Sequence, residues 1–186
     1  MKYVYLIASL LFSAGVCQAQ EEDLLPERTY FRKFCAKFPL EEKPNIMADT
    51  NHIAIWKMIE DVDEHNYFVV QRYNMNQYVF TYMNRGGSNR TYENVSAYFS
   101  KVVNSTFLTV PLYDHETETV GYFFSKVTDL DSRGWNMTLS LVADTTLKDI
   151  TSRSSLLERI EKNVNNPNFY KAPVHLKKKL PLLYCK

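Results

Sequence analysis

The stretch that decides the fold class is WNMTLSLV, residues 135–142. Large apolar side chains occupy every second position, beginning with Trp135 and ending with Leu141. A period of two is typical of a strand that is buried on one face. The alternate positions carry the N-glycosylation sequon that begins at Asn136, and a glycan must point outward. Both signals predict a β-strand whose polar face is outside.

Six similar segments precede this one. They are rich in β-branched and aromatic residues and are separated by polar turns, a pattern that is typical of a β-sandwich or β-barrel. We expect strands within His52–Glu60, Tyr67–Tyr73, Tyr78–Met83, Thr91–Phe99, Thr106–Leu112 and Val120–Val127.

The period changes after the last of these strands. Ser155 and Glu158 match a capping box, and Leu156, Ile160 and Val164 share one helical face, which predicts a short amphipathic helix. We expect the rest, 168–186, to be an ordered tail. Its run of three lysines, 177–179, has the composition of a solvated surface or of a heparin-binding or membrane-binding patch.

The first 19 residues have the composition of a secretory signal peptide. A positive start at Lys2 precedes an apolar run from Val4 to Phe12, and Ala19 supplies a small residue at the expected cleavage site. A membrane anchor is the alternative, but the apolar run is shorter than the roughly 20 residues that span a bilayer. The sequence therefore predicts a signal peptide over 1–19 and one secreted, extracellular domain over 20–186.

Cysteines and sequons agree with export. After cleavage only Cys35 and Cys185 remain, and two cysteines in an oxidising compartment usually pair, although a free reactive thiol is the alternative. We therefore expect a Cys35–Cys185 disulfide. Four sequons predict a glycoprotein, with acceptors at Asn89, Asn94, Asn104 and Asn136.

Composition excludes several functions. The net charge is +1, which gives no electrostatic reason to expect nucleic acid as a partner, and only 5 Gly occur, none of them in a phosphate-binding run. The four histidines are scattered and no hydrolase motif is present, so we expect no enzyme, no cofactor and no metal. The acidic run 114–118 has the ligands to hold a cation, but its pattern is also that of a solvated loop.

The segment from Met47 to Glu60 indicates a resemblance to a known protein family. This segment resembles the opening of the lipocalin family, particularly its divergent arthropod members: a short polar run is followed by Trp56 in a first strand. Cys35 upstream, and a helix and Cys185 downstream, follow the order of the same family. The resemblance implies a mainly β fold, an eight-stranded up-and-down antiparallel barrel with one C-terminal α-helix packed outside. It also implies that Trp56 plugs the closed end of the barrel.

The chain departs from the family pattern in three places. Ala54 replaces the usual Gly before the Trp, and the Arg that packs on the Trp is absent, since Ala143 and Asp144 stand about where it would be. The second family motif has two candidates, 112–114 and 128–131. The first leaves two strands after it, as the family requires, and is preferred.

The resemblance implies a binding site inside the barrel. The chain has 13 Tyr, 11 Phe and 2 Trp, an excess that fits either an aromatic ligand cavity or a filled core. Strand alternation, with Phe107 and Thr109 taken as inward-facing, selects the following candidate ligand-binding residues: Tyr78, Phe80, Tyr82, Phe99, Phe107, Tyr122, Phe124, Met137 and Leu139.

We therefore expect a secreted carrier that holds a small hydrophobic or amphipathic molecule, of the lipid, hormone, pheromone or biogenic-amine class, in the barrel. The alternative is a protein-interaction module that grips a partner with the loops at the open end and has no small ligand.

Overall fold

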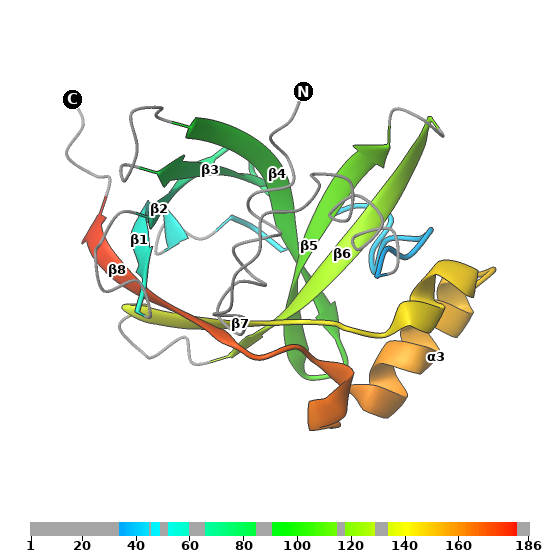
Figure 1. Cartoon of the computed structure of the whole chain (residues 1–186). Coiled ribbons are helices and arrows are strands. Elements are labelled where there is room, and N and C mark those ends of the chain that lie inside the picture. The colour runs from blue at the N-terminus through cyan, green and yellow to red at the C-terminus, as the bar shows by residue number, and fades with distance from the viewer. Residues whose placement is uncertain are drawn as a thin grey trace, which may run out of the picture.

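The computed structural model describes residues 34–44, 46–48, 52–59, 66–84, 91–114, 118–128 and 134–181. Eight antiparallel strands in these ranges form one closed barrel in which sequence neighbours pair, and a helix lies outside it, as predicted (Figure 1). The strands are β1 (Ala54–Met58), β2 (Asn66–Arg72), β3 (Tyr78–Asn84), β4 (Thr91–Val102), β5 (Ser105–Asp114), β6 (Thr119–Thr128), β7 (Asn136–Leu141) and β8 (Val174–Pro181).

Strand β8 closes the barrel. It pairs with β7, where Leu139 lies opposite Val174, and with β1, where Met58 lies opposite Leu176. The ordered tail expected over 168–186 therefore contains a strand over 174–181, which was not predicted because three consecutive lysines hide its alternation. Three strands follow 112–114, not the two that favoured this segment as the second family motif.

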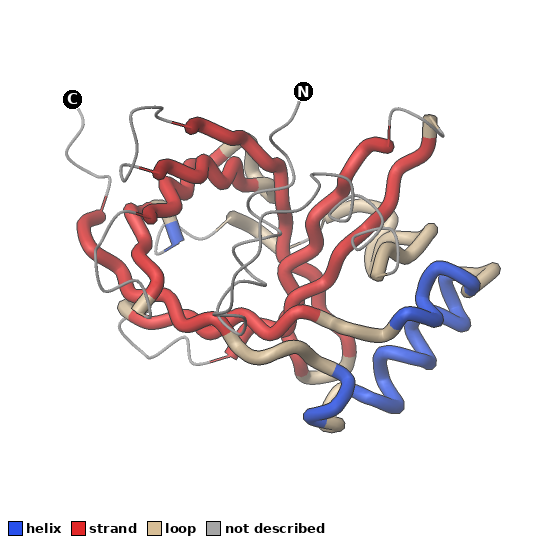
Figure 2. The backbone as a smooth tube through the Cα atoms, viewed as in Figure 1, coloured by secondary structure: helices blue, strands red, loops and turns tan. Residues whose placement is uncertain are grey.

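Helix α3 (Arg153–Asn163) lies between β7 and β8 in the chain and outside the ring of strands (Figure 2). Its N-cap is Ser152, whose hydroxyl accepts a hydrogen bond of 3.2 Å from the Ser155 backbone N–H. The capping box predicted at Ser155 and Glu158 was therefore wrong. Ser155 matches the motif but lies inside the helix, whereas Ser152 has no Glu or Gln three residues later but is extended and precedes the first helical residue.

An ion pair fixes α3 against the end of β7. Arg159 Nε donates to Asp144 Oδ2 at 2.6 Å, and Asp144 also accepts from the Thr146 backbone N–H at the start of the 3₁₀ helix η2 (Thr145–Asp149). Burial raises the pKa of Asp144, but the hydrogen bonds from Arg159 and Thr146 outweigh burial and bring this pKa below its ordinary value. A second 3₁₀ helix, η3 (Pro167–Phe169), connects α3 to β8.

The molecule has two large apolar clusters. One gathers residues from all eight strands and is described below as the barrel-interior cluster. The other, the helix-side cluster, packs the outer face of β4–β6 against α3. Its buried members are Ala36, Leu40, Val102, Phe107, Phe124, Val142, Leu147, Leu156, Ile160 and Phe169.

Residues 34–44 form an N-terminal strap along the edge of β6, with Ala36 and Leu40 in the helix-side cluster and Phe34 packed with Phe123 and Leu141. Ala36 forms a two-hydrogen-bond bridge with Tyr122, and Arg153 of α3 donates two hydrogen bonds to the carbonyl oxygen of Leu40, at 3.1 and 2.7 Å. A Cβ at Gly121 would lie 2.9 Å from Cys35 Sγ, closer than real Cβ contacts allow. Any larger residue at this position, where the strap pairs with β6, would therefore have to displace the Cys35 side chain.

Candidate functional site: the barrel interior

The barrel-interior cluster is one continuous apolar surface. Every strand contributes to it, so the face that these residues share is the inner face of the barrel. Its most exposed buried members, Phe80 and Val127, are only 7% exposed, and Trp56 and Tyr78 are 0% exposed. The buried members are Ala48, Ala54, Trp56, Met58, Phe68, Val70, Tyr78, Phe80, Ala97, Phe99, Leu108, Val127, Met137, Leu139, Val174 and Leu176.

Trp56 is buried in this cluster from strand β1. Its Nε1 donates a hydrogen bond of 3.0 Å to the carbonyl oxygen of His52, which ties the strand to the turn before it. Phe68 of β2 lies opposite it on one side, and Lys178 of β8 lies opposite on the other. Packing and hydrogen bonding together fix the indole at one position.

Lys178 of β8 places its ammonium group over the Trp56 ring. The Lys178 Nζ lies 5.5 Å from the centre of a Trp56 ring, a cation–π distance, and the residue is only 9% exposed. The prediction of a solvated lysine run was therefore wrong for Lys178, although Lys177 and Lys179 are exposed. Sequence alternation predicts this division once 174–181 is known to be a strand.

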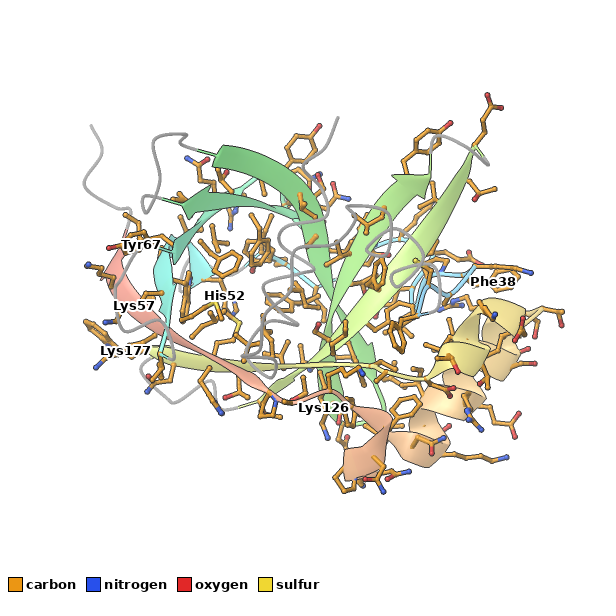
Figure 3. The ribbon with its side chains drawn as sticks, in the orientation of Figure 1. Phe38, His52, Lys57, Tyr67, Lys126 and Lys177 are labelled. Carbon is orange, nitrogen blue, oxygen red and sulfur yellow. The ribbon has the colours of Figure 1, made fainter. Side chains whose placement is uncertain are left out.

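A histidine–tyrosine pair supplies polar groups to the interior. His52 Nδ1 and the Tyr78 hydroxyl share a hydrogen bond of 3.1 Å, and Phe99 packs against both rings, with centroid distances of 4.8 and 5.3 Å. Figure 3 shows His52 inside the ring of strands, whereas Lys57 and Lys177 lie on its outer side. His52 was missed as a site residue because the histidines were assessed only as catalytic groups; the signal that could have found it is its shared parity with Trp56 in the predicted segment His52–Glu60.

Five of the predicted ligand-binding residues lie in the interior cluster. They come from β3, β4 and β7, and their inward direction was predicted from alternation: Tyr78, Phe80, Phe99, Met137 and Leu139. The backbone of Tyr82 belongs to β3, opposite Phe68 of β2, but its side chain lies outside the described residues.

The other three predicted residues face the wrong way for a barrel site. Phe107 and Phe124 are buried in the helix-side cluster, and Tyr122 packs against that cluster. Their neighbours Leu108 and Val127 take the interior positions instead. The prediction failed because β5 and β6 are apolar on both faces, one against the interior and one against α3. Alternation then does not tell the two faces apart.

The outer face beneath the strap carries its own polar groups. Ser100 and Thr109, both 0% exposed, share a hydrogen bond of 3.0 Å between their hydroxyls. Burial, followed by the electrostatic influence of Tyr122 and Glu41, raises the pKa of Tyr98 to about 12. Glu41 Oε1 accepts from the Lys101 backbone N–H at 3.3 Å, while its Oε2 is buried and has no hydrogen-bond partner among the described residues.

The expected modifications are only partly placed. Cys35 contacts the backbone of β6 at Gly121, but Cys185 lies outside the described residues, so the Cys35–Cys185 disulfide stays a prediction. Asn104, in the turn between β4 and β5, and Asn136, at the start of β7, are exposed. Asn89, the side chain of Asn94 and residues 1–19, the predicted signal peptide, lie outside the described residues.

Among the described residues, no group of three or more His, Cys, Asp or Glu side chains is placed to hold a metal ion. No helix in that same part of the chain is long and apolar enough to cross a membrane. Comparison of the chain with protein-family models, with curated proteins and with solved structures finds no match.

Proposed function

We propose that this protein is a secreted, lipocalin-like carrier that binds a small hydrophobic or amphipathic molecule inside its barrel. The observation that carries the proposal is the single apolar cluster to which all eight strands contribute. A barrel of eight strands is wide enough either to be filled by side chains or to hold one small ligand. Binding alone requires no catalytic group and no cofactor.

The chemistry of the wall favours an apolar body with a polar end. Phe80, Phe99 and Tyr78 present aromatic surface, and the Tyr78–His52 pair offers hydrogen-bonding groups beside it. A ligand that buries about 300 Å² of apolar surface gains about 7 kcal/mol at 25 cal/mol per Å². Part of this gain is lost to the entropy of association, so apolar burial alone should give a dissociation constant no lower than about 10 μM, the value that corresponds to 7 kcal/mol. Lipids, hormones, pheromones and biogenic amines have this combination of groups.

The test uses an environment-sensitive apolar fluorophore and two matched variants. Phe80→Ala removes an aromatic ring from the interior cluster, and Phe124→Ala removes one from the helix-side cluster. Both substitutions truncate a buried Phe and cost about 3–5 kcal/mol of stability. Only Phe80→Ala should weaken probe binding, once affinity is corrected for the folded fraction measured by circular dichroism. The proposal fails if no apolar probe binds or if both variants weaken it equally.

A second candidate is a protein-interaction module, and the β5–β6 hairpin favours it. Beyond Thr109, β5 pairs with β6 and no longer with β4, and the hairpin extends away from the ring of strands (Figure 1). Tyr113 and Val120 lie opposite each other there and are 53% and 41% exposed. Tyrosines are enriched at interface hot spots.

Native mass spectrometry of the secreted protein distinguishes the two functions. A co-purified small molecule supports the carrier. An empty barrel that retains a polypeptide partner, and loses it in Tyr113→Ser, supports the interaction module.

A further inference from the structure

Ser125 of β6 is directed to the inner face of the barrel. It lies opposite Leu108 of β5 on one side and Leu141 of β7 on the other, and residues that are opposite each other share a face of the sheet. Leu108 belongs to the barrel-interior cluster, and so do Val127, two residues further along β6, and Leu139, two residues before Leu141. Register and strand alternation therefore agree that the Ser125 hydroxyl is on the inner side.

The hydroxyl of Ser125 differs from the other buried serine and threonine hydroxyls. Ser125 is 3% exposed, and in the ranges that the structure describes its side chain forms no hydrogen bond. By contrast, Ser100 and Thr109 bond to each other at 3.0 Å, and Thr138 bonds to His175 Nδ1 at 3.0 Å. The wall positions opposite Ser125 and two residues away along β6 carry apolar side chains that cannot serve as partners: Leu108, Phe123, Val127 and Leu141.

An unpartnered hydroxyl at this position is costly. Buried polar groups in folded proteins nearly always have a hydrogen-bond partner, and one without a partner loses its hydration and gains nothing in return. Alanine would fill almost the same volume without that loss. A partner from outside the chain, either a ligand or a water molecule, would remove the cost.

Ser125 also lies in the same row of the wall as an aromatic part of the interior. Strand pairing joins Phe99 to Leu108 and Leu108 to Ser125, so only one strand separates the phenyl ring from the hydroxyl. Neighbouring strands are about 4.8 Å apart, which places Phe99 and Ser125 roughly 10 Å from each other along the wall. Phe99 packs in turn against the rings of His52 and Tyr78. An apolar body lying over Leu108 and Phe99 thus has one end beside Ser125.

We propose that the Ser125 hydroxyl hydrogen-bonds the polar end of the ligand, and that this end is an uncharged hydroxyl or carbonyl group. The inference rests on the proposed carrier function and narrows its ligands to neutral alcohols, phenols and ketones with an apolar body. A serine hydroxyl both donates and accepts, so it can serve either group. A charged end would lose its hydration at this position without meeting an opposite charge on the four apolar wall positions around Ser125.

The test uses three probes that share one bicyclic body and are substituted at the same ring position: naphthol, methylnaphthalene and naphthoate. Each competes with the apolar fluorophore at neutral pH, for the wild type and for Ser125→Ala. The affinities for naphthol and methylnaphthalene are compared as a ratio, because their difference in partition from water cancels between the two proteins. This ratio should fall about fivefold in Ser125→Ala, the factor that one neutral hydrogen bond contributes. Naphthoate should bind the wild type more weakly than naphthol.

Two further serine variants locate the effect. Ser100→Ala removes a fully buried hydroxyl from the outer face of the sheet and should leave the ratio unchanged. Ser125→Thr keeps a hydroxyl and should retain at least part of the ratio. In ligand-free protein, Ser125→Ala should not lower the urea midpoint, because no hydrogen bond to a described residue is lost, whereas Ser100→Ala should lower it by leaving Thr109 without its partner.

Three binding results would overturn the inference: an unchanged ratio in Ser125→Ala, an equal fall in Ser100→Ala, or tighter binding of naphthoate than of naphthol. The first is also the result expected if only a water molecule bonds to Ser125. A ligand-free midpoint that falls as far in Ser125→Ala as in Ser100→Ala would overturn it too, because the hydroxyl would then bond within the chain. In all these cases the probes still bind, so the carrier function itself stands. Failure of every probe to bind would instead refute the carrier function, and this inference with it.

Discussion

Truncation of Trp56 tests how the interior is held together. Trp56→Ala removes an indole that is 0% exposed, which costs about 3–5 kcal/mol for a large core side chain. It also removes the hydrogen bond to His52 O, worth about 1 kcal/mol, and the ring beneath the Lys178 ammonium, worth up to about 2 kcal/mol. These contributions overlap. We therefore expect a loss near the top of the truncation range, about 5 kcal/mol.

Urea unfolding followed by far-ultraviolet circular dichroism measures this loss. With a slope of about 2 kcal/mol per molar urea, the midpoint of Trp56→Ala should fall by about 2.5 M. The milder variant Trp56→Phe keeps a ring and loses the indole N–H, so its midpoint should fall by less. Trp135→Ala is the matched control, because Trp135 is 47% exposed and its loss should change stability by less than about 1 kcal/mol.

A double-mutant cycle isolates the contact with the cation. Trp56→Phe, Lys178→Met and the double variant together give the coupling energy between the two side chains, which we expect to be about 0.5–2 kcal/mol. Two results would refute the reasoning. One is a Trp56→Ala midpoint equal to that of Trp135→Ala, and the other is a coupling energy of zero.

Three further predictions concern the outside of the barrel. Asp144→Asn should lower the free energy of unfolding by about 0.5–1 kcal/mol at neutral pH, a modest loss because Arg159 is partly exposed. The folded-state pKa of Asp144 is depressed, so the difference should vanish as acid protonates the wild-type carboxylate. A pH-independent difference would contradict this. The pKa of Tyr98 is raised from 10.0 to about 12, so the contribution of its neutral phenol to folding stability is complete below pH 10 and is lost towards pH 12. In alkaline unfolding curves the wild type should therefore lose stability relative to Tyr98→Phe over that range. Parallel curves would refute this. Gly121→Ala should lower the free energy of unfolding in urea by about 1–3 kcal/mol, because its Cβ meets the Cys35 side chain. The same substitution should cost less in a Cys35→Ala background. Equal losses in the wild-type and Cys35→Ala backgrounds would exclude the close contact.

The seven strands up to Leu141 could be predicted because each is short, periodic and bounded by polar turns. The eighth could not, because its central lysines have the composition of a solvated surface. Lys178 is buried beside Trp56, which is far away in the sequence. Burial of a charged side chain depends on such tertiary partners, and composition does not record them.

The inner wall could be predicted where a strand has one apolar face. In β7 the alternation of Met137 and Leu139 with polar residues identifies the inward side. In β5 and β6 it does not, because Phe107 and Phe124 are as apolar as their inward neighbours and serve the contact with α3. That choice is decided only once the helix is in place, which is tertiary information.

Closure by β8 determines when this barrel can be completed. The partners of β8 are β1 and β7, so β1 leaves the ribosome before β2 to β7 and α3 are made and only then meets its last neighbour. At the usual 5–20 residues per second, this interval is on the order of ten seconds. During it the edges of β1 and β7 lack the strand that will cover them, and uncovered edges pair with other chains. Folding of this protein is therefore most exposed to aggregation just before its last strand is released, and chaperones that cover strand edges at that stage should raise its yield.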